Sequence, residues 1–243
     1  QMCIRDSLYP ALLRYGVESA AKMGFRVGVV SNAYWAVDRR AAELTLRPFA
    51  KLVQDLSISG DRYHGEEGPQ AEVEHAVAAA ENLAIPVDVI TIAPPEESDA
   101  AMPSGQLPPG TSRVCYRGRA AQQLVDRAAL WPAENFAECP YEDLVDPGRV
   151  HVDALGYVHL CQGISIGNLH RRPLAEICRD YDPRSDPIVA PLLEGGPLRL
   201  ARAHGLDLAK SYADACHLCY DTRNRLRSQY PESLAPDNMY GEL

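Results

Sequence analysis

The chain has 243 residues, enough to bury a sizeable core as one large domain or as one and a half smaller ones. Its formal net charge of −9 leaves no basic surplus for a nucleic-acid partner. No apolar run is long enough to span a bilayer and no secretory signal is present, so we expect a cytoplasmic location and no membrane partner. In such a reducing compartment the seven cysteines are expected to be metal ligands before they are disulfides.

The first seven residues have no cap, period or turn that joins them to the rest of the chain. Within them, Met-Cys-Ile-Arg-Asp-Ser resembles translated sequencing-adapter sequence. We therefore interpret residues 1–7 as a non-native artefact and exclude them from the fold prediction. The alternative is a frayed native terminus.

Helices and strands alternate from Leu8 to a domain boundary that we place between 131 and 138. Apolar residues at helical spacing, such as Leu13, Val17 and Ala20, predict amphipathic helices, and short apolar runs that stop at turn residues predict buried strands. The strands are expected at 25–30, 55–59, 87–92 and 112–116, and the helices at about 13–24, from beyond 32 to about 49, at 73–83 and at 121–128. Such alternation implies right-handed crossovers and a parallel sheet.

The polar, proline-rich segment 94–112 predicts a loop.

Two cysteines are expected to have a structural role only. Cys115 follows this loop in the middle of the fourth predicted strand, where a buried and inert thiol is expected. Cys178 shares a helical face with Leu174 and Ile177, so we expect it in the core.

Four other cysteines, Cys139, Cys161, Cys216 and Cys219, carry the chemistry. Cys161 closes a Gly-x4-Cys step in a hairpin expected around Leu155-Gly156, and Cys216 and Cys219 project from one face of a helix turn. Four thiolates are what a 4Fe–4S cluster needs, and tetrahedral zinc accepts the same set. The spacing alone therefore leaves iron–sulfur and zinc open.

Several short motifs accompany these cysteines in a fixed order. They are Ser31-Asn32-Ala33 after the first strand, Ser59-Gly-Asp61-Arg-Tyr-His64 after the second, Gly118-Arg119-Ala120 after the fourth, the four cysteines themselves, and the Gly-Asn-Leu…Leu…Ile pattern from Gly167 to Ile177. In this order they resemble the radical SAM enzymes that carry a SPASM or twitch extension. The resemblance covers nearly all of the chain from Leu8 onward. It implies an α/β fold: a partial radical-SAM-type (β/α)6 barrel over residues 8–132, followed by a small α+β cysteine-rich extension over residues 133–243.

The same resemblance implies an activity. Enzymes of this family reductively cleave S-adenosylmethionine (SAM) and use the resulting radical on a substrate, which in many relatives is a peptide or protein. The resemblance makes the four cysteines ligands of an auxiliary 4Fe–4S cluster, and it assigns Asn32, Ser59, Asp61 and Arg119 to the SAM side of the site. The implied partners are SAM, the substrate and a reductant protein. Turn and cap chemistry is the alternative explanation of these four polar positions.

The sequence departs from the family at the catalytic loop. It contains neither the Cys-x3-Cys-x-x-Cys loop that holds the SAM-binding cluster nor the Gly-Gly-Glu-Pro motif that holds the methionine end of SAM. We therefore expect a chain that lacks the first part of the barrel and is inactive by itself, while the full-length parent binds SAM and a second 4Fe–4S cluster. The remaining strands should form an open sheet in chain order, with helices on one side and the first strand at an edge.

Two alternatives to the enzyme remain from the residues alone. One is a structural or interaction module in which the four cysteines bind zinc. The other is an α/β domain without metal, whose cysteines are buried as small apolar side chains.

Overall fold

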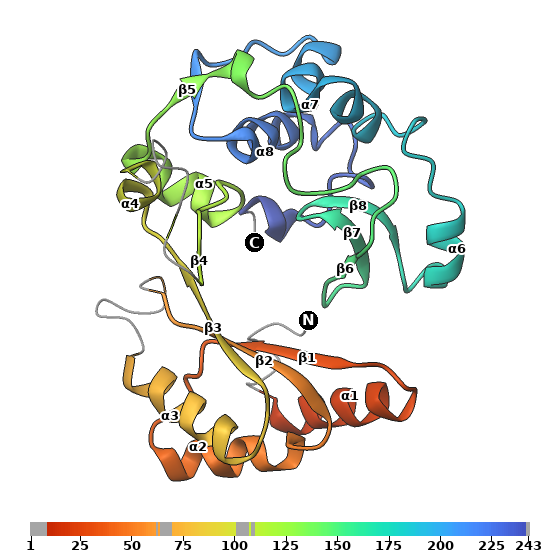
Figure 1. The fold of residues 1–243 in the computed structure, drawn as a ribbon. Helices are drawn as coiled ribbons and strands as arrows, with labels where there is room; N and C mark the ends of the chain where they lie inside the picture. The colour runs from red at the N-terminus through yellow and green to blue at the C-terminus, as the bar shows by residue number, and fades with distance from the viewer. Residues whose placement is uncertain (1–8, 62, 64–69, 101–106, 108–109, 242–243) are drawn as a thin grey trace. The chain divides into compact units, whose positions relative to one another are not determined.

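A computed structural model describes the chain except for residues 1–8, 62, 64–69, 101–106, 108–109 and 242–243 (Figure 1). The predicted artefact at residues 1–7 and the motif residue His64 therefore lie outside the described residues. The chain forms two compact units, Gln1–Pro94 with Ala101–Arg113, and Pro95–Ala100 with Val114–Leu243. The domain boundary between 131 and 138 marks the start of the cysteine-rich sequence and stays a prediction.

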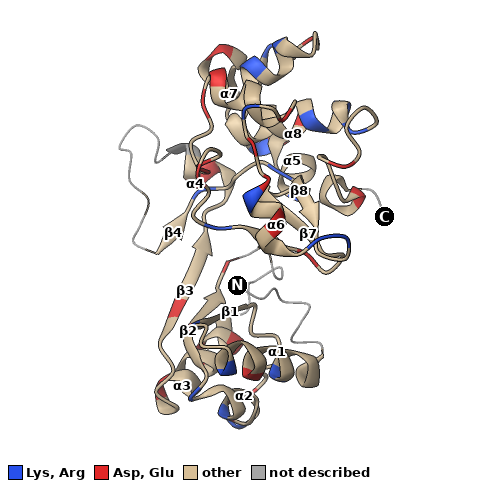
Figure 2. Ribbon diagram, turned by 90° about the vertical axis from the view of Figure 1, so that its right-hand side faces the viewer, with Lys and Arg blue, Asp and Glu red and all other residues tan. Residues whose placement is uncertain are grey.

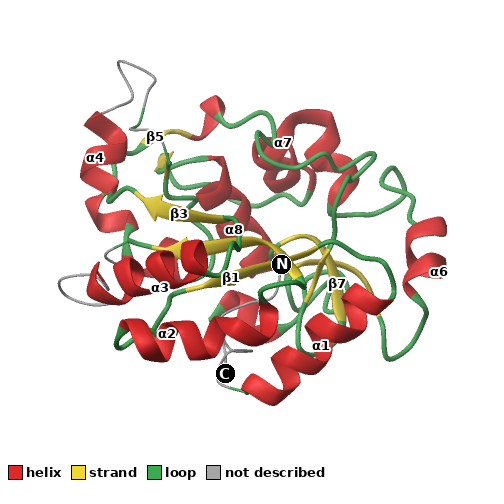
Figure 3. Ribbon diagram, turned by 60° about the horizontal axis from the view of Figure 1, so that its bottom comes forward, coloured by secondary structure: helices red, strands yellow, loops and turns green. Residues whose placement is uncertain are grey.

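The first unit is built on a parallel sheet. Its four strands are β1 (Val27–Ser31), β2 (Val53–Ser59), β3 (Val87–Ile92) and β4 (Thr111–Ser112), and they lie in the order β1-β2-β3-β4. The helices α1 (Pro10–Lys22), α2 (Arg39–Leu46) and α3 (Gln70–Asn82) lie together on one side of this sheet (Figures 1 and 3). The predicted parallel sheet with its strands in chain order is thus confirmed. β1 is an edge strand, because β2 is its one neighbour among the described strands.

The core of this unit follows from the helical period of the sequence. Val17 on α1, Ala80 on α3 and Ile58 on β2 are all fully buried and belong to one continuous apolar core. Small alanine side chains on α2 and α3 allow these helices to pack closely against each other and against the sheet. Gly24, which ends the segment after α1, has a φ of +86°, a conformation that glycine adopts without strain.

Two local predictions for this region are wrong. The fourth strand ends at Ser112, so Cys115 lies in the coil beyond it and is only half-buried. The segment predicted as a loop at 94–112 contains the helix α4 (Pro95–Ala100), since proline is well suited to a first helical turn. The helix α4 belongs to the second unit, and a bidentate ion pair between Glu96 and Arg127, at 2.7 and 2.9 Å, holds it there.

The second unit is α+β. Its helices are α5 (Arg119–Gln123), α6 (Leu174–Arg179), α7 (Val189–Ala203) and α8 (Ala215–Leu226), with 3-10 turns at Val125–Arg127, Ala133–Asn135 and Asp237–Tyr240. Its strands form two antiparallel sheets, β5 (Trp131–Pro132) with β9 (Ser211–Tyr212), and β6 (His151–Val152), β7 (Tyr157–Cys161) and β8 (Ile164–Asn168) in that order. The helix predicted at 121–128 is therefore the short α5 and a 3-10 turn. Basic and acidic residues are interspersed along α6 and α7 (Figure 2).

The prediction for Cys178 is also wrong. Cys178 is exposed on α6, and Leu174, four residues before it, is 40% exposed. Ile177 alone turns inward and is buried. Because α6 has only six residues, one inward side chain is enough to attach it, and the other apolar side chains of the turn remain at the surface.

None of the helices in the described part of the chain is both long and apolar enough to cross a bilayer.

We expect Asp38→Ala to destabilise the first unit by about 1 kcal/mol, because Asp38 is the N-cap of α2 and accepts a 2.7 Å hydrogen bond from the Ala41 amide. Arg39→Ala, at an exposed neighbouring position, is the matched control and should change the free energy of unfolding by less than about 0.5 kcal/mol. Urea unfolding of both variants measures the difference. Equal values for the two variants would show that the cap does not contribute.

Candidate metal centre

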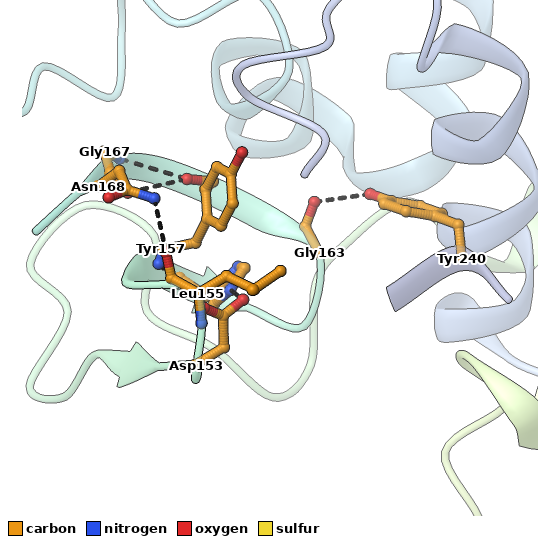
Figure 4. Close-up of polar contacts among 9 residues, drawn as sticks. Asp153, Leu155, Tyr157, Gly163, Gly167, Asn168 and Tyr240 are labelled. Atoms are coloured by element: carbon orange, nitrogen blue, oxygen red, sulfur yellow. Dashed lines mark hydrogen bonds and ion pairs between the residues drawn. The ribbon is translucent and has the colours of Figure 1, made fainter. Parts of the chain in front are cut away.

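The hairpin β7–β8 positions Cys161. Cys161 is the last residue of β7 and pairs with Ile164 across the two-residue turn Gln162-Gly163. Gly163 has a φ of +80°, and its carbonyl accepts a 2.6 Å hydrogen bond from the Tyr240 hydroxyl (Figure 4). A Cβ atom at this glycine would lie 2.8 Å from that hydroxyl, so the close approach of Tyr240 requires glycine here. The turn is thereby fixed to the C-terminal segment.

The other end of β7 is held by a second set of hydrogen bonds. The Asp153 carboxylate accepts from the amides of Leu155 and Tyr157 at 2.8 and 3.0 Å, and the Asn168 amide donates to the Leu155 carbonyl at 3.0 Å (Figure 4). Gly156, at the predicted turn, has a φ of +80°. The hairpin predicted around Leu155-Gly156 is confirmed, and its register carries Cys161 to the end of β7.

The helix α8 positions two further cysteines. It begins after Asp214, whose side chain caps the helix by accepting a 2.7 Å hydrogen bond from the His217 amide. Cys216 and Cys219 then stand three residues apart, one turn of the helix, as their sequence spacing predicts.

The structure brings Cys139, Cys161, Cys216 and Cys219 to one cavity, which we call the four-cysteine cavity. Its other lining residues are Arg117, Pro140, Leu144, Ile164, Leu192, Pro197, Ala215 and Arg223. The cavity measures about 20 Å³, which is room for about one water molecule. Among the described residues no three His, Cys, Asp or Glu side chains are arranged as a ready site for a metal ion. The role of the four cysteines as ligands therefore stays a prediction.

A buried arginine lies at this cavity. The Arg223 side chain is 1% exposed, and its guanidinium donates to the carbonyls of Cys219 and Gln162 at 3.2 and 2.7 Å. No carboxylate of the described residues lies within 4 Å of it. Burial disfavours its charge, but the nearby Tyr240 hydroxyl and the cysteine sulfurs outweigh burial, and its pKa is raised. Arg223 thus remains a cation. The groups that raise its pKa, the Tyr240 hydroxyl and the cysteine thiols, carry a negative charge only when they are deprotonated.

The cysteine thiols by themselves do not supply a negative charge to balance Arg223. Burial raises the pKa of the Cys219 thiol to about 11, so without a bound metal this group is protonated at neutral pH. Metal binding removes the thiol protons and leaves thiolates. The four-cysteine cavity therefore has a cation that a metal–thiolate centre would neutralise.

A second arginine contacts the cavity from a different segment. The Arg117 guanidinium donates a 3.0 Å hydrogen bond to the Cys161 sulfur. Its other neighbour is Glu142, whose carboxylate lies 3.9 Å away and also pairs with Arg149 at 3.2 Å. Arg117 is therefore held between a carboxylate and a predicted ligand.

The sequence missed three residues of the site. Arg223 follows Cys219 by four residues on α8, so helical spacing carried a signal for it. Arg117 and Cys115 lie in coil and carried no comparable signal. The neighbouring Cys216 thiol is the main cause that lowers the pKa of the Cys115 thiol to about 7, and Cys115 in turn raises the pKa of Cys216.

Three of the predicted SAM-side residues lie at one edge of the first sheet. Asn32 directly follows β1, Ser59 is the last residue of β2, and Asp61 lies two residues further. The pairing of Ser31 with Ile58 places these strand ends side by side, as is usual for ligand sites of parallel sheets. The Asp61 carboxylate is buried and accepts a 3.1 Å hydrogen bond from the Tyr63 amide.

The fourth SAM-side residue belongs to the other unit. Arg119 is the first residue of α5 and is exposed. The structure therefore groups Asn32, Ser59 and Asp61 at one edge, and it places Arg119 on a separate compact unit. A role of any of the four in binding SAM stays a prediction.

In comparisons with known proteins, no family model matches the sequence and no curated protein matches it significantly.

Proposed function

We propose that the second unit binds one 4Fe–4S cluster through Cys139, Cys161, Cys216 and Cys219, as the auxiliary cluster of a radical SAM enzyme. One observation carries this proposal: four cysteines and a buried arginine, Arg223, line one cavity. Among the described residues, no carboxylate lies within 4 Å of the Arg223 guanidinium. The resemblance of the motifs to this family gives the cluster its class. The reaction on SAM, the substrate, the reductant protein and a cytoplasmic location belong to the same proposal.

The donor set suits such a cluster. Four cysteine thiolates satisfy its four irons, and the basic surroundings balance the negative charge that cluster and thiolates carry together. The cavity measures only about 20 Å³, so we expect the four thiol side chains to move apart when a cluster binds. When bound, the cluster supplies one-electron redox chemistry.

The chain's own residues then have distinct tasks. The buried Arg223 guanidinium, next to Cys219, balances part of the negative charge of the cluster and its thiolates. Arg117 orients the Cys161 sulfur through its 3.0 Å hydrogen bond, while Glu142 keeps the guanidinium in place. A cluster held by all four of these cysteines would leave no free iron for SAM to bind. Cleavage of SAM therefore needs the Cys-x3-Cys-x-x-Cys loop that this sequence does not contain.

The test is metal analysis of the chain purified without oxygen. We expect about four irons and about four sulfides per chain, with a broad charge-transfer absorption band in the visible spectrum. Reduced protein incubated with SAM should give no more 5′-deoxyadenosine than a blank without protein. About one zinc per chain and no sulfide would favour the zinc module instead, and a metal-free chain would exclude both.

Alanine substitution of single ligands is expected to remove the cluster. Cys139→Ala, Cys161→Ala and Cys219→Ala should each lower the iron bound per chain by at least about fivefold, because a buried cluster is held weakly by three thiolates. Cys178→Ala removes an exposed thiol of α6 and is the matched control, with iron unchanged. Iron and sulfide assays of the reconstituted variants measure the effect. Loss of iron from the Cys178 variant as well would indicate general unfolding.

A further inference from the structure

Tyr240, in the 3-10 turn near the end of the chain, packs beside the elements that carry the cysteines. Its side chain is 3% exposed and belongs to the apolar core against which Cys139, Cys161 and Cys219 pack. Cys161 comes from β7 and Cys219 from α8, whereas Cys139 comes from the coil between β5 and β6. One aromatic side chain of the C-terminal segment therefore shares its core with three of the four predicted ligands.

The Tyr240 hydroxyl joins two parts of the candidate metal centre. It donates a 2.6 Å hydrogen bond to the Gly163 carbonyl, in the turn that follows Cys161 (Figure 4). It also accepts a 3.3 Å hydrogen bond from the Arg223 guanidinium, whose central carbon lies 5.6 Å from the centre of the Tyr240 ring. One oxygen atom thus links the turn next to a predicted ligand with the buried cation on α8.

The backbone and the ring of Tyr240 are held by other contacts. Its carbonyl accepts hydrogen bonds from the Tyr220 hydroxyl at 3.0 Å and from the Gln122 side-chain amide at 3.3 Å. The rings of Tyr220 and Tyr240 are stacked with their centroids 5.8 Å apart, and the Arg227 guanidinium lies 5.0 Å from the Tyr240 ring. These contacts do not use the Tyr240 hydroxyl, so its removal alone should leave the ring in place.

The contact with Arg223 exceeds what packing requires of a tyrosine. A buried tyrosine hydroxyl needs one hydrogen-bond partner, and the Gly163 carbonyl already provides it. Arg223, in turn, has no carboxylate within 4 Å among the described residues. Its guanidinium is held by three neutral acceptors, the carbonyls of Cys219 and Gln162 and the Tyr240 hydroxyl. The position of the buried cation therefore depends on Tyr240.

We propose that Tyr240 is a positioning residue of the metal centre, whose hydroxyl fixes the Gly163 turn and the Arg223 guanidinium relative to each other. The inference rests on the proposed function of the four-cysteine cavity and adds a residue that acts on the centre through two neighbours. Through Gly163 the hydroxyl limits the movement of Cys161, two residues earlier. Through Arg223 it keeps a positive charge beside the thiolates, and such surroundings help to set the reduction potential of a cluster.

The test compares Tyr240→Phe with Tyr220→Phe in the full chain after anaerobic reconstitution with iron and sulfide. Tyr220→Phe is the matched control, because it removes the hydroxyl of the other stacked ring, which contacts the Tyr240 carbonyl and Gln122. Tyr240→Phe should release iron to a chelator about three to ten times faster than the wild type, since one hydrogen bond contributes about that factor. Its reduction potential should be more negative, because Arg223 is held less firmly. Tyr220→Phe should match the wild type in both.

A second measurement uses the metal-free chain. Alkylation of Cys161 by iodoacetamide, followed by mass spectrometry of its peptide, should be at least about threefold faster in Tyr240→Phe than in Tyr220→Phe. Circular dichroism checks that both variants fold. If Tyr240→Phe does not, Gly163→Ala is the second variant, since a Cβ atom there would lie 2.8 Å from the Tyr240 hydroxyl and would push the same two groups apart.

Equal iron release, reduction potential and alkylation in the two variants would overturn the positioning role, while the iron content of the wild type would still support the cluster. A wild-type chain that binds zinc refutes the iron–sulfur function, and zinc release then replaces iron release in the same comparison. A wild-type chain without any metal refutes the proposed function. The alkylation rates alone then decide whether Tyr240 holds the Gly163 turn.

Discussion

Replacing Arg223 by methionine is expected to abolish metal binding and to leave the metal-free chain folded. Arg223 has 1% of its surface exposed, and in the proposed metal-bound protein it would be the buried cation beside the thiolates. Removing one partner of a buried charge pair costs about 3–5 kcal/mol, or about two to nearly four powers of ten in metal affinity. In the metal-free chain the same change removes a buried charge that has no carboxylate within 4 Å among the described residues. The cost there is the loss of the hydrogen bonds that the guanidinium donates to the Gln162 and Cys219 carbonyls and to the Tyr240 hydroxyl, about 1–3 kcal/mol for each buried acceptor that is left without a partner.

The measurement is the unfolding temperature of the metal-free and the metal-reconstituted protein, together with iron content. Arg225→Met is the matched control, because Arg225 lies two residues further on α8, is exposed, and donates to the Asp207 carbonyl at 2.6 Å. It should keep the wild-type iron. If Arg223→Met binds iron like the wild type, the four-cysteine cavity does not need a counter-charge, and the main support for an anionic centre is lost.

The sequence predicted the parallel sheet because its strands and helices differ in period. The apolar run at Val27–Ser31 and the helical spacing of Leu13 and Val17 are local signals, and neither depends on distant residues. Predictions failed where a segment's environment decides its structure. The pattern at 112–116 predicts a strand, yet pairing with β3 ends at Ser112 and Asp214 holds the next residues instead.

The candidate metal centre shows the same division. Four cysteines could be selected from their order and spacing, and the structure brings them to one cavity. Cys115 could not, since its segment is fixed by the hydrogen bond from the Tyr116 amide to Asp214, 98 residues away, and no local pattern signals that contact. The prediction for Cys178 failed for another reason. Its spacing from Leu174 and Ile177 predicts burial, but the helix is short and leaves Cys178 exposed.

Gly196→Ala is expected to be the most destabilising single-methyl addition in the second unit. Gly196 interrupts α7 with a φ of +61° and a ψ of −159°, a region that is essentially restricted to glycine. A Cβ atom there would lie 2.3 Å from the Glu138 backbone nitrogen and 2.5 Å from the Ala137 carbonyl carbon. Backbone strain and overpacking together predict a loss of about 4 kcal/mol, which lowers the unfolding temperature by roughly 10–15 °C.

The consequence reaches the metal centre, because residues 137–138 lead directly into Cys139. The Leu198 amide, two residues beyond Gly196, donates a 3.2 Å hydrogen bond to the Phe136 carbonyl, so α7 holds this segment in place. Displacing it moves Cys139 away from the other three cysteines, and iron content should fall with stability. Gly205→Ala is the matched control: its φ is +63°, but an added Cβ meets no atom within 4 Å. It should cost only about 1–2 kcal/mol of backbone strain and keep its iron. Calorimetry and iron assays of both variants test the argument, and equal losses would show that the contact with residues 137–138 is not what requires glycine.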